Sequence, residues 1–103
     1  MRLFAFHCRD GADSAALRQQ ALAAHLAHIE AHIDEYAVAG PLVESDRTVG
    51  SLLVIKAADP AEARARLEAD PYFIAGVWDR VTLDEFRAVA GDWVGGAAWK
   101  HQS

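Results

Sequence analysis

The sequence predicts an α+β fold in which four strands and two helices follow one another in the order β-α-β-β-α-β. Three observations carry this prediction. Four short runs are apolar and rich in β-branched or aromatic residues, two longer runs consist mainly of helix formers, and turn-forming residues separate them.

The first strand and the first helix dominate the N-terminal half. Residues 2–8 form a short apolar run that ends at the turn-forming residues 10–13. From Asp13 or Ser14, either of which can cap a helix, the chain is rich in Ala, Leu, Gln and Glu to about Glu35. Apolar residues recur there every three or four positions, and we expect this stripe to face the sheet: Leu22, Leu26, Ile29, Ile33 and Tyr36.

Two further strands precede the second helix. An extended run begins at Tyr36, is punctuated by Gly40-Pro41 and ends at the polar residues 44–47. Residues 51–56 are the most strand-like run in the chain, because Leu, Val and Ile dominate it.

The second helix has a well-defined start and end. Asp59 can cap it, Pro60 fits the first helical position, and Glu62 stands three residues after the cap. We expect the helix to end at Asp70, because Pro71 disfavours the helical conformation in the residue before it.

A fourth strand completes the pattern. After a connector at 72–76, residues 77–89 alternate between two faces. One face should carry Val77, Val81 and Leu83, and the other Trp78, Thr82 and Phe86. Two split β-α-β units of this size predict a ferredoxin-like sandwich, an antiparallel sheet with both helices on one face.

The strands are apolar on both faces, although helices can cover only one. Successive residues of a strand point to opposite faces, and in the first and third strands both sets are apolar: Leu3, Phe4, Ala5 and Phe6, then Leu52, Leu53, Val54 and Ile55. A second copy of the chain would bury the uncovered face by two-fold symmetry, so we expect a homodimer. The alternative is that the tail, with Trp93 and Trp99, folds over that face, and both arrangements are compatible.

Length and composition limit the organisation and the partners. A chain of 103 residues with 52% hydrophobic content suits one domain, which we place at 1–90, with a C-terminal extension at 91–103 that we expect at the dimer interface. A net charge of −5 argues against nucleic acid. The lone Cys8 and the absence of a long apolar run favour a cytoplasmic protein without a membrane span.

Histidines on the first helix are the first candidates for chemistry. His25, His28 and His32 lie on one side of that helix, and the last two have the spacing of a metal-binding pair. No carboxylate or cysteine follows at the spacing of a zinc site, so we expect no metal. A carboxylate beside His25 would orient the ring and strengthen it as a base, and Asp70 is the candidate; without further information Asp70 could simply end a helix.

Four short motifs follow one another along the chain: His25-Leu26-Ala27-His28-Ile29, Ala39-Gly40-Pro41-Leu42, Gly50-Ser51, and Asp70-Pro71-Tyr72 with Gly76. In order and spacing they resemble the YCII-related (YciI-like) family. The resemblance extends to about Phe86. It implies the dimeric α/β barrel, in which the sheets of two ferredoxin-like subunits face each other.

The resemblance also implies a site. It makes His25 and Asp70 a catalytic pair, and Ser51, with Gly50, a source of a hydrogen bond to a ligand. Pro41 and Tyr72 are the other substrate contacts that it suggests. Many relatives carry Arg-Pro-Ala before the histidine, whereas Leu22-Ala23-Ala24 stand here, so an arginine of the family is missing at that place.

Three classes of function remain open. The leading one is a small-molecule enzyme, of isomerase or dehydrochlorinase-like lyase type, that uses the pair for proton transfer. Its substrate would be a hydroxylated or lactone-like ring, with no metal and no organic cofactor. The alternative is a non-catalytic dimeric ligand-binding or accessory module; a metal sensor built on His28 and His32 is the third.

Overall fold

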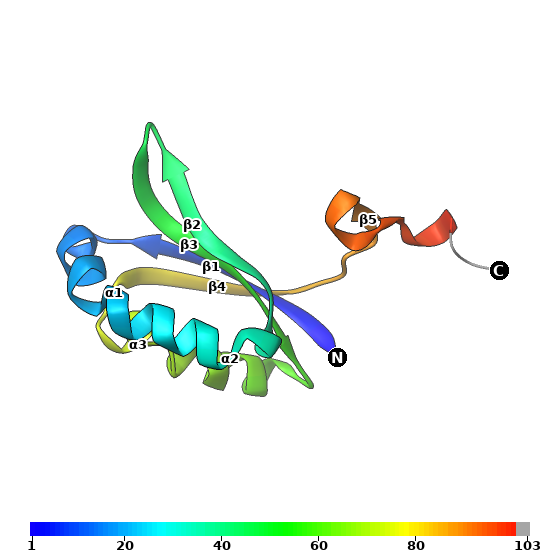
Figure 1. Cartoon of the computed structure of the whole chain (residues 1–103), viewed down its shortest axis with the longest axis horizontal. Helices are drawn as coiled ribbons and strands as arrows, with labels where there is room; N and C mark the ends of the chain where they lie inside the picture. The colour runs from blue at the N-terminus through cyan, green and yellow to red at the C-terminus, as the bar shows by residue number, and fades with distance from the viewer. Residues whose placement is uncertain (101–103) are drawn as a thin grey trace.

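Four strands form one antiparallel sheet in the order β2-β3-β1-β4 in the computed structural model, which describes residues 1–100 (Figure 1). The strands are β1 (Arg2–Asp10), β2 (Tyr36–Glu44), β3 (Arg47–Ala57) and β4 (Trp78–Phe86). The helices are α1 (Ser14–Ala31), α2 (Pro60–Glu68) and the short α3 (Pro71–Ile74), and a 3-10 turn, η1 (Ile33–Glu35), follows α1. The predicted α+β ferredoxin-like fold is confirmed.

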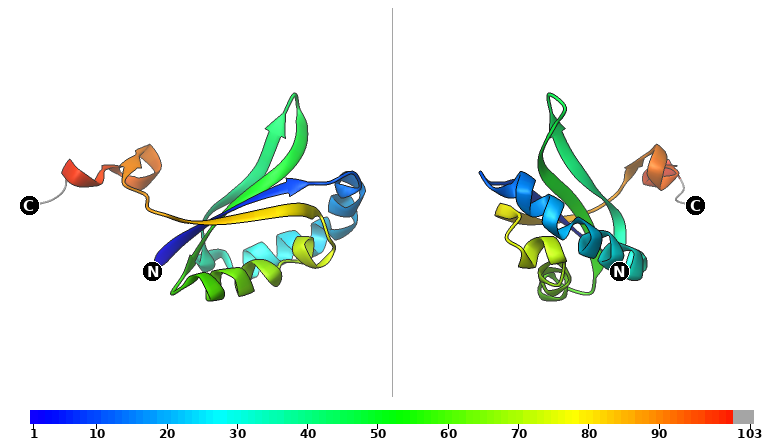
Figure 2. Two further views of the ribbon diagram at one scale, coloured as in Figure 1. Left: turned by 180° about the vertical axis from the view of Figure 1, so that it is seen from behind. Right: turned by 60° about the vertical axis from the view of Figure 1, so that its left-hand side comes forward.

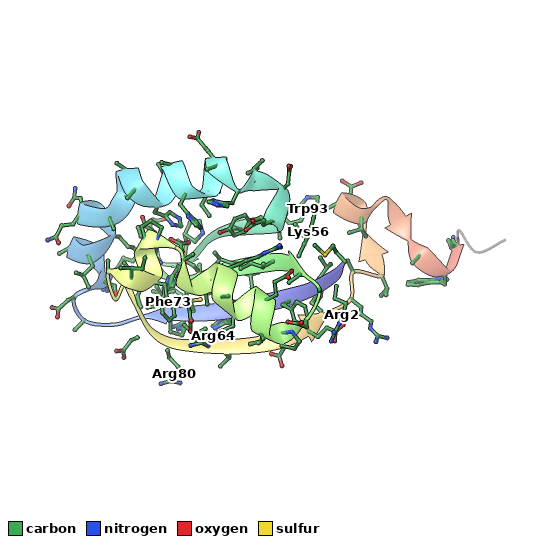
Figure 3. The ribbon with its side chains drawn as sticks, turned by 90° about the horizontal axis from the view of Figure 1, so that it is seen from below. Arg2, Lys56, Arg64, Phe73, Arg80 and Trp93 are labelled. Atoms are coloured by element: carbon green, nitrogen blue, oxygen red, sulfur yellow. The ribbon has the colours of Figure 1, made fainter. Side chains whose placement is uncertain are left out.

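All three helices lie on one face of the sheet, as Figures 1 and 2 show. Figure 3 looks onto this helical layer, where Phe73 of α3 lies beside Arg64 of α2. The core between the two layers is built on the strand residues that point toward the helices: Phe4, Phe6, Cys8, Leu53, Ile55 and Ala57. Each of these is at most 2% exposed, so this face of the sheet is dry.

Helix α1 presents a different face to the sheet from the one its apolar stripe predicts. Leu22 is 45% exposed and Leu26 is 51% exposed, whereas Leu17, Ala21 and Ile29 pack against the core. The prediction that the stripe as a whole faces the sheet is therefore wrong. Leucines at the edge of the stripe are left free to line a cavity beside the helix.

The chain uses the same helix-start signal twice, and only the first use was predicted. The Asp59 carboxylate accepts a 2.8 Å hydrogen bond from the backbone N–H of Glu62, with Pro60 in the first turn of α2. Asp70 and Pro71 repeat this arrangement, since the Asp70 carboxylate accepts from the backbone N–H of Tyr72 at 2.8 Å. Asp70 therefore caps a further helix, α3, where a simple connector was expected.

A bulge in the last strand moves one aromatic residue into the core. Arg9 pairs with Arg80, but Asp10 pairs with Trp78, so Asp79 is skipped in the register. Trp78 then shares the helical side of the sheet with Val81 and is 8% exposed. The expectation that Trp78 lies on the opposite face from Val81 is wrong for this reason.

The far face of the sheet and the tail stay open in the single chain. Leu52 is 37% exposed and Phe86 47%, and Figure 2 shows no helix over this face of the sheet. After β4 the chain forms a small hairpin of β5 (Ala90–Gly91) and β6 (Gly96–Ala97), with the 3-10 turns η2 (Asp92–Val94) and η3 (Ala98–Lys100). This tail lies beyond the end of the sheet instead of over it (Figure 1). The last part of the expected extension, 101–103, lies outside the described residues.

Replacing the aspartate that caps α3 should cost more than replacing the one that caps α2. Asp59→Ala should lower the free energy of unfolding by about 1 kcal/mol. Asp70 is fully buried, so Asp70→Ala also leaves a buried N–H unpaired, and we expect a loss of about 2–4 kcal/mol. Urea denaturation of both variants measures this. An equal or smaller loss for Asp70→Ala would contradict the structural role given to this cap.

A side chain at Gly50 should disrupt the pairing of β1 and β3. A Cβ atom there would lie 2.2 Å from the backbone oxygen of Cys8, whereas one at Gly40 would meet nothing within 4 Å. Gly50→Ala should therefore lower stability by about 1–3 kcal/mol, and Gly40→Ala should stay within about 0.5 kcal/mol of the wild type. Thermal unfolding checks both, and equal melting temperatures would show that the strands can separate at no cost.

Candidate functional site

A histidine of α1 and the capping aspartate of α3 form a close pair. The Nδ1 atom of His25 lies 2.7 Å from Oδ1 of Asp70. The Asp70 side chain is fully buried and that of His25 is 16% exposed. The two residues predicted to form a pair are therefore in direct contact, on the inner side of the helical layer.

A second hydrogen bond holds the Asp70 carboxylate in place, and the fixed carboxylate favours one position for the proton on the His25 ring. Its Oδ1 also accepts from the backbone N–H of Tyr72, so the carboxylate cannot turn away from His25 without uncapping α3. A neutral imidazole beside a carboxylate places its N–H on the nitrogen that faces the charge. Nδ1 of His25 is thus the donor, and Nε2, which has no protein partner within residues 1–100, carries the lone pair.

The charge of Asp70 contributes to the raised pKa values of two other groups in the core. Burial raises the pKa of Tyr36 to about 12, and the charge of Asp70 adds to the shift. Burial likewise raises the pKa of the Cys8 thiol to about 12, again with a contribution from Asp70. Because its pKa is raised, the Cys8 thiol stays protonated, and it is a core thiol and not a nucleophile. Oδ2 of Asp70 itself is buried and has no hydrogen-bond partner in the part of the chain that the structure describes.

Aromatic rings hold the imidazole in a fixed plane. The ring of His25 stacks on that of Tyr72, with centroids 3.7 Å apart and an interplanar angle of 2°. Tyr72 in turn meets the Trp78 ring edge to face at 5.9 Å. Stacking and the Asp70 hydrogen bond together leave His25 little freedom to turn.

A partly buried arginine, Arg18, forms the other side of the site. Arg18 binds the Asp10 carboxylate through Nε at 2.7 Å and Nη2 at 2.9 Å. Nη2 also reaches the Gly50 backbone oxygen at 3.0 Å and Ser51 Oγ at 2.9 Å. The Trp78 indole N–H donates to the same Ser51 oxygen at 3.1 Å. Burial lowers the pKa of Arg18, but the hydrogen bond and charge of Asp10 outweigh this, and the net shift is upward.

These groups surround a cavity of about 410 Å³ between α1 and the β2–β3 hairpin. Its walls are Arg18, Leu22, His25, Leu26, Ile29, Ala39, Gly40, Pro41, Thr48, Ser51, Leu53, Tyr72 and Trp78. A second cavity, of about 520 Å³, lies at the other end of the sheet around Arg2 and Glu85 and contains none of these groups. The first cavity is the candidate site, because the side chains of His25, Arg18 and Ser51 converge there beside the buried Asp70.

The structure brings most of the predicted site residues together. His25, Ser51, Pro41 and Tyr72 line the cavity, while Asp70 lies behind His25. Gly50 is not on the wall; it is buried against β1, and its carbonyl oxygen holds Arg18.

The other two histidines of the cluster do not assemble a metal site. His28 and His32 lie side by side, with ring centroids 4.4 Å apart, and Nδ1 of His32 is 2.8 Å from the His28 backbone oxygen. Within residues 1–100 no group of three or more His, Cys, Asp and Glu side chains is placed to hold an ion.

Sequence reasoning missed Arg18, Asp10 and the role of Trp78. Arg18 precedes His25 by seven positions, about two helical turns, so it shares the face of α1 that carries the histidine. This spacing was the available signal. Arg18 also supplies a guanidinium to the cavity from one helical turn before residue 22, where the Arg-Pro-Ala step of many relatives has its arginine. The bulge that brings Trp78 inward has no signal in the residue pattern.

No helix within residues 1–100 is long and apolar enough to cross a membrane.

Solved structures give two comparisons. The chain superposes with a TM-score of 0.74 and 26% identity on a 5-chloro-2-hydroxyhydroquinone dehydrochlorinase from Burkholderia phenoliruptrix AC1100, solved in complex with 2,5-dihydroxybenzoquinone. The match covers 87% of this chain and 96% of that one. An antibiotic-biosynthesis-monooxygenase-type protein from Nitrosomonas europaea matches with a TM-score of 0.51 and 12% identity over 86% of this chain and 99% of that chain, which shows the shared fold alone.

Sequence comparisons agree with the predicted resemblance. The chain is 31% identical over 96 residues to the protein YciI of Escherichia coli O6:H1 and, equally, to that of Shigella flexneri. Each match covers 84% of this chain and 98% of the relative. The family model of the YCII-related domain matches residues 2–87, and the chain therefore belongs to the YCII-related family.

Proposed function

We propose that this protein is a small-molecule enzyme that moves a proton through the His25–Asp70 pair. The observation that carries the proposal is the 2.7 Å contact between His25 Nδ1 and a fully buried carboxylate, at the wall of a cavity large enough for a substituted ring. Membership of the YCII-related family and the likeness to a dehydrochlorinase support a reaction on a small molecule.

The pair has the roles that general acid–base catalysis requires. Asp70 fixes the Nδ1–H form and stabilises the imidazolium, so Nε2 of His25 can take a proton from a substrate hydroxyl or activated C–H. The electron pair left on the substrate then either shifts a double bond, with the proton returned at another carbon, or expels a leaving group as an anion. The first course is an isomerisation and the second an elimination.

The cavity walls fit a flat, oxygenated ring. Tyr72 and Trp78 offer aromatic surfaces, Leu22 and Leu26 offer apolar ones, and Ser51 is a polar contact. The dehydrochlorinase relative was solved with a dihydroxybenzoquinone, a ligand of this shape and polarity. Hydroxylated aromatic or quinone-like rings are therefore the substrate class that we propose.

We further propose that the working form is a homodimer joined through the uncovered sheet face. Three apolar strand residues on this face are 37–47% exposed: Leu52, Val38 and Phe86. Apolar residues that gather on one exposed face are typical of an interaction surface. The tail carries two more exposed aromatics, Trp93 at 87% and Trp99 at 61%, and would add to the same interface as an extension of the 1–90 domain.

Removing the imidazole should strongly reduce turnover without unfolding the protein. Hydroxylated, chlorinated and quinone rings are screened by thermal shift, and the ligands found are followed by mass spectrometry for product. His25→Ala should lower kcat by about 10²–10⁴-fold, whereas His28→Ala on the same helix and His32→Ala just after its end should leave kcat unchanged. Unchanged turnover in His25→Ala would remove this residue from the mechanism. A ligand that stabilises the wild type but yields no product would identify a non-catalytic binding module.

A charge on the uncovered sheet face should separate the subunits. Leu52→Glu should shift the mass measured by light scattering from dimer to monomer, because a buried unpaired carboxylate is strongly unfavourable at an interface. Ile74→Glu is the matched control, since Ile74 is 72% exposed on α3, on the helical side. A wild-type mass of one chain would rule out the dimer.

A further inference from the structure

We propose that the tail of a second copy of the chain closes the groove between α1 and β2, so that each cavity is completed by the partner's Trp93 and the partner's Trp99. The tail is residues 88–100, and the groove is the open side of the cavity that holds His25. The inference deepens the proposed function, because it rests on the proposed homodimer and adds a wall to the proposed site.

The tail is an arm that stands apart from its own sheet. An extended connector at 87–89 follows β4, and the family match ends at residue 87, so the tail lies outside the shared domain. The tail folds on itself, since the backbone N–H of Ala98 donates to the oxygen of Val89 at 2.7 Å. Trp93, at 87%, is the most exposed large apolar residue of the part that the structure describes. An ordered arm with exposed aromatic side chains is typical of a segment that docks onto another surface.

An apolar stripe on α1 lies open beside the cavity. Leu22 and Leu26 line the cavity but remain about half exposed, and Ile33 continues the stripe two helical turns after Leu26. The facing wall belongs to the edge strand β2, where Ala39 and Pro41 pair with residues of β3 that point toward the helices. The groove between α1 and β2 is therefore apolar on both sides and uncovered in the single chain.

The tail of the same chain lies too far away to fill this groove. Trp78, at the start of β4, is on the cavity wall, whereas Phe86, at its end, pairs with Leu3 at the other end of the sheet. Nine strand residues separate the two ends by roughly 30 Å. The tail then continues away from the sheet (Figure 1). An apolar arm and an apolar groove thus lie at opposite ends of one chain.

Two-fold symmetry can bring the arm and the groove together. When the uncovered sheet faces pack against each other, the two-fold axis lies between them, either along the strands or across them. An axis across the strands reverses their direction, so the end of the partner's β4 lies at the cavity end of the first sheet. The partner's tail then begins beside the β2–β3 hairpin, which forms one wall of the groove. An axis along the strands would leave both tails far from both cavities.

The contact would also enlarge the dimer interface and enclose the site. A buried tryptophan removes about 150–250 Å² from water, so two from each tail contribute roughly 600–1,000 Å². This is a large part of the about 1,200–2,000 Å² that a stable interface buries. An aromatic cover over Leu22 and Leu26 would exclude water from the cavity, which strengthens the electrostatic interactions of His25 with a bound ring.

Cross-linking in the intact protein tests which chain supplies the tail. Asp92→Cys places a thiol beside Trp93, and Glu30→Cys places one on the exposed stripe of α1. The double variant is treated with a short bismaleimide and analysed on a denaturing gel, with the wild type, whose Cys8 is buried, as the blank. The expected product has the mass of two chains. In the matched control Ala61→Cys, on the exposed side of α2, replaces Glu30→Cys, and no product beyond that of Asp92→Cys alone should form.

A dye that fluoresces on apolar surfaces tests whether the groove is covered. 8-Anilinonaphthalene-1-sulfonate is added to the wild type and to the variant with Trp93→Ser and Trp99→Ser. Loss of two free aromatic side chains would lower the dye signal, whereas uncovering an apolar groove raises it. We expect a rise of about two- to fivefold. Adding Leu22→Ser and Leu26→Ser should reverse the rise, because the newly exposed surface is that of the groove.

The outcomes separate this proposal from the proposed function. A cross-link within one chain, no product above the control, or a lower dye signal in the tryptophan variant would each overturn the shared groove. A two-chain mass by light scattering alongside any of these results leaves the homodimer standing. If the two-chain cross-link forms but turnover is unchanged in His25→Ala, the shared groove stands and the catalytic proposal fails. A wild-type mass of one chain ends both the dimer and the shared groove.

Discussion

A single buried carboxylate ties the helical layer to the site. Asp70 Oδ1 accepts the Tyr72 backbone N–H that starts α3 and the Nδ1–H of His25 on α1. The capping bond and the histidine contact therefore depend on the same oxygen, and the imidazole is oriented by the fold itself. Because Asp70 is fully buried, water cannot replace either partner.

Aromatic residues connect the His25–Asp70 contact to the rest of the cavity. Tyr72 follows Asp70 by two residues, so the turn that caps α3 also carries the ring that stacks on His25. Trp78, brought inward by the bulge in β4, connects this aromatic pair to Ser51 on β3. One side of the cavity thus holds the His25 imidazole, in contact with Asp70, and the other the Ser51 hydroxyl, in contact with Arg18 and Trp78.

The sequence predicted the order of elements well, because local signals and the apolar pattern agree. The start of α2 is an example: Asp59, Pro60 and Glu62 act at the cap as their spacing indicates. Reading Asp70-Pro71 only as a helix end missed that the same two residue types begin α3. The face of α1 was misjudged because Leu22 and Leu26 line a cavity, and an apolar stripe does not distinguish a cavity wall from a core.

The site was predictable only in part. The His25–Asp70 contact was expected from the family motifs, because the two residues are 45 positions apart and only tertiary packing brings them together. The Arg18–Ser51–Trp78 hydrogen bonds were not expected. The spacing of Arg18 and His25 places both on one face of α1, but the contact of Trp78 with Ser51 depends on a register shift in β4 that the residue pattern does not encode.

The protonation of the two His25 nitrogens is the most direct test of the central claim. Long-range ¹H–¹⁵N correlation spectra of the ¹⁵N-labelled protein, recorded where the ring is neutral, report which nitrogen carries the proton. The account predicts the Nδ1–H form with a bare Nε2, and a loss of this preference in Asp70→Ala, which removes the acceptor. A neutral ring protonated at Nε2 would contradict it, because the base would then point at the carboxylate and not into the cavity.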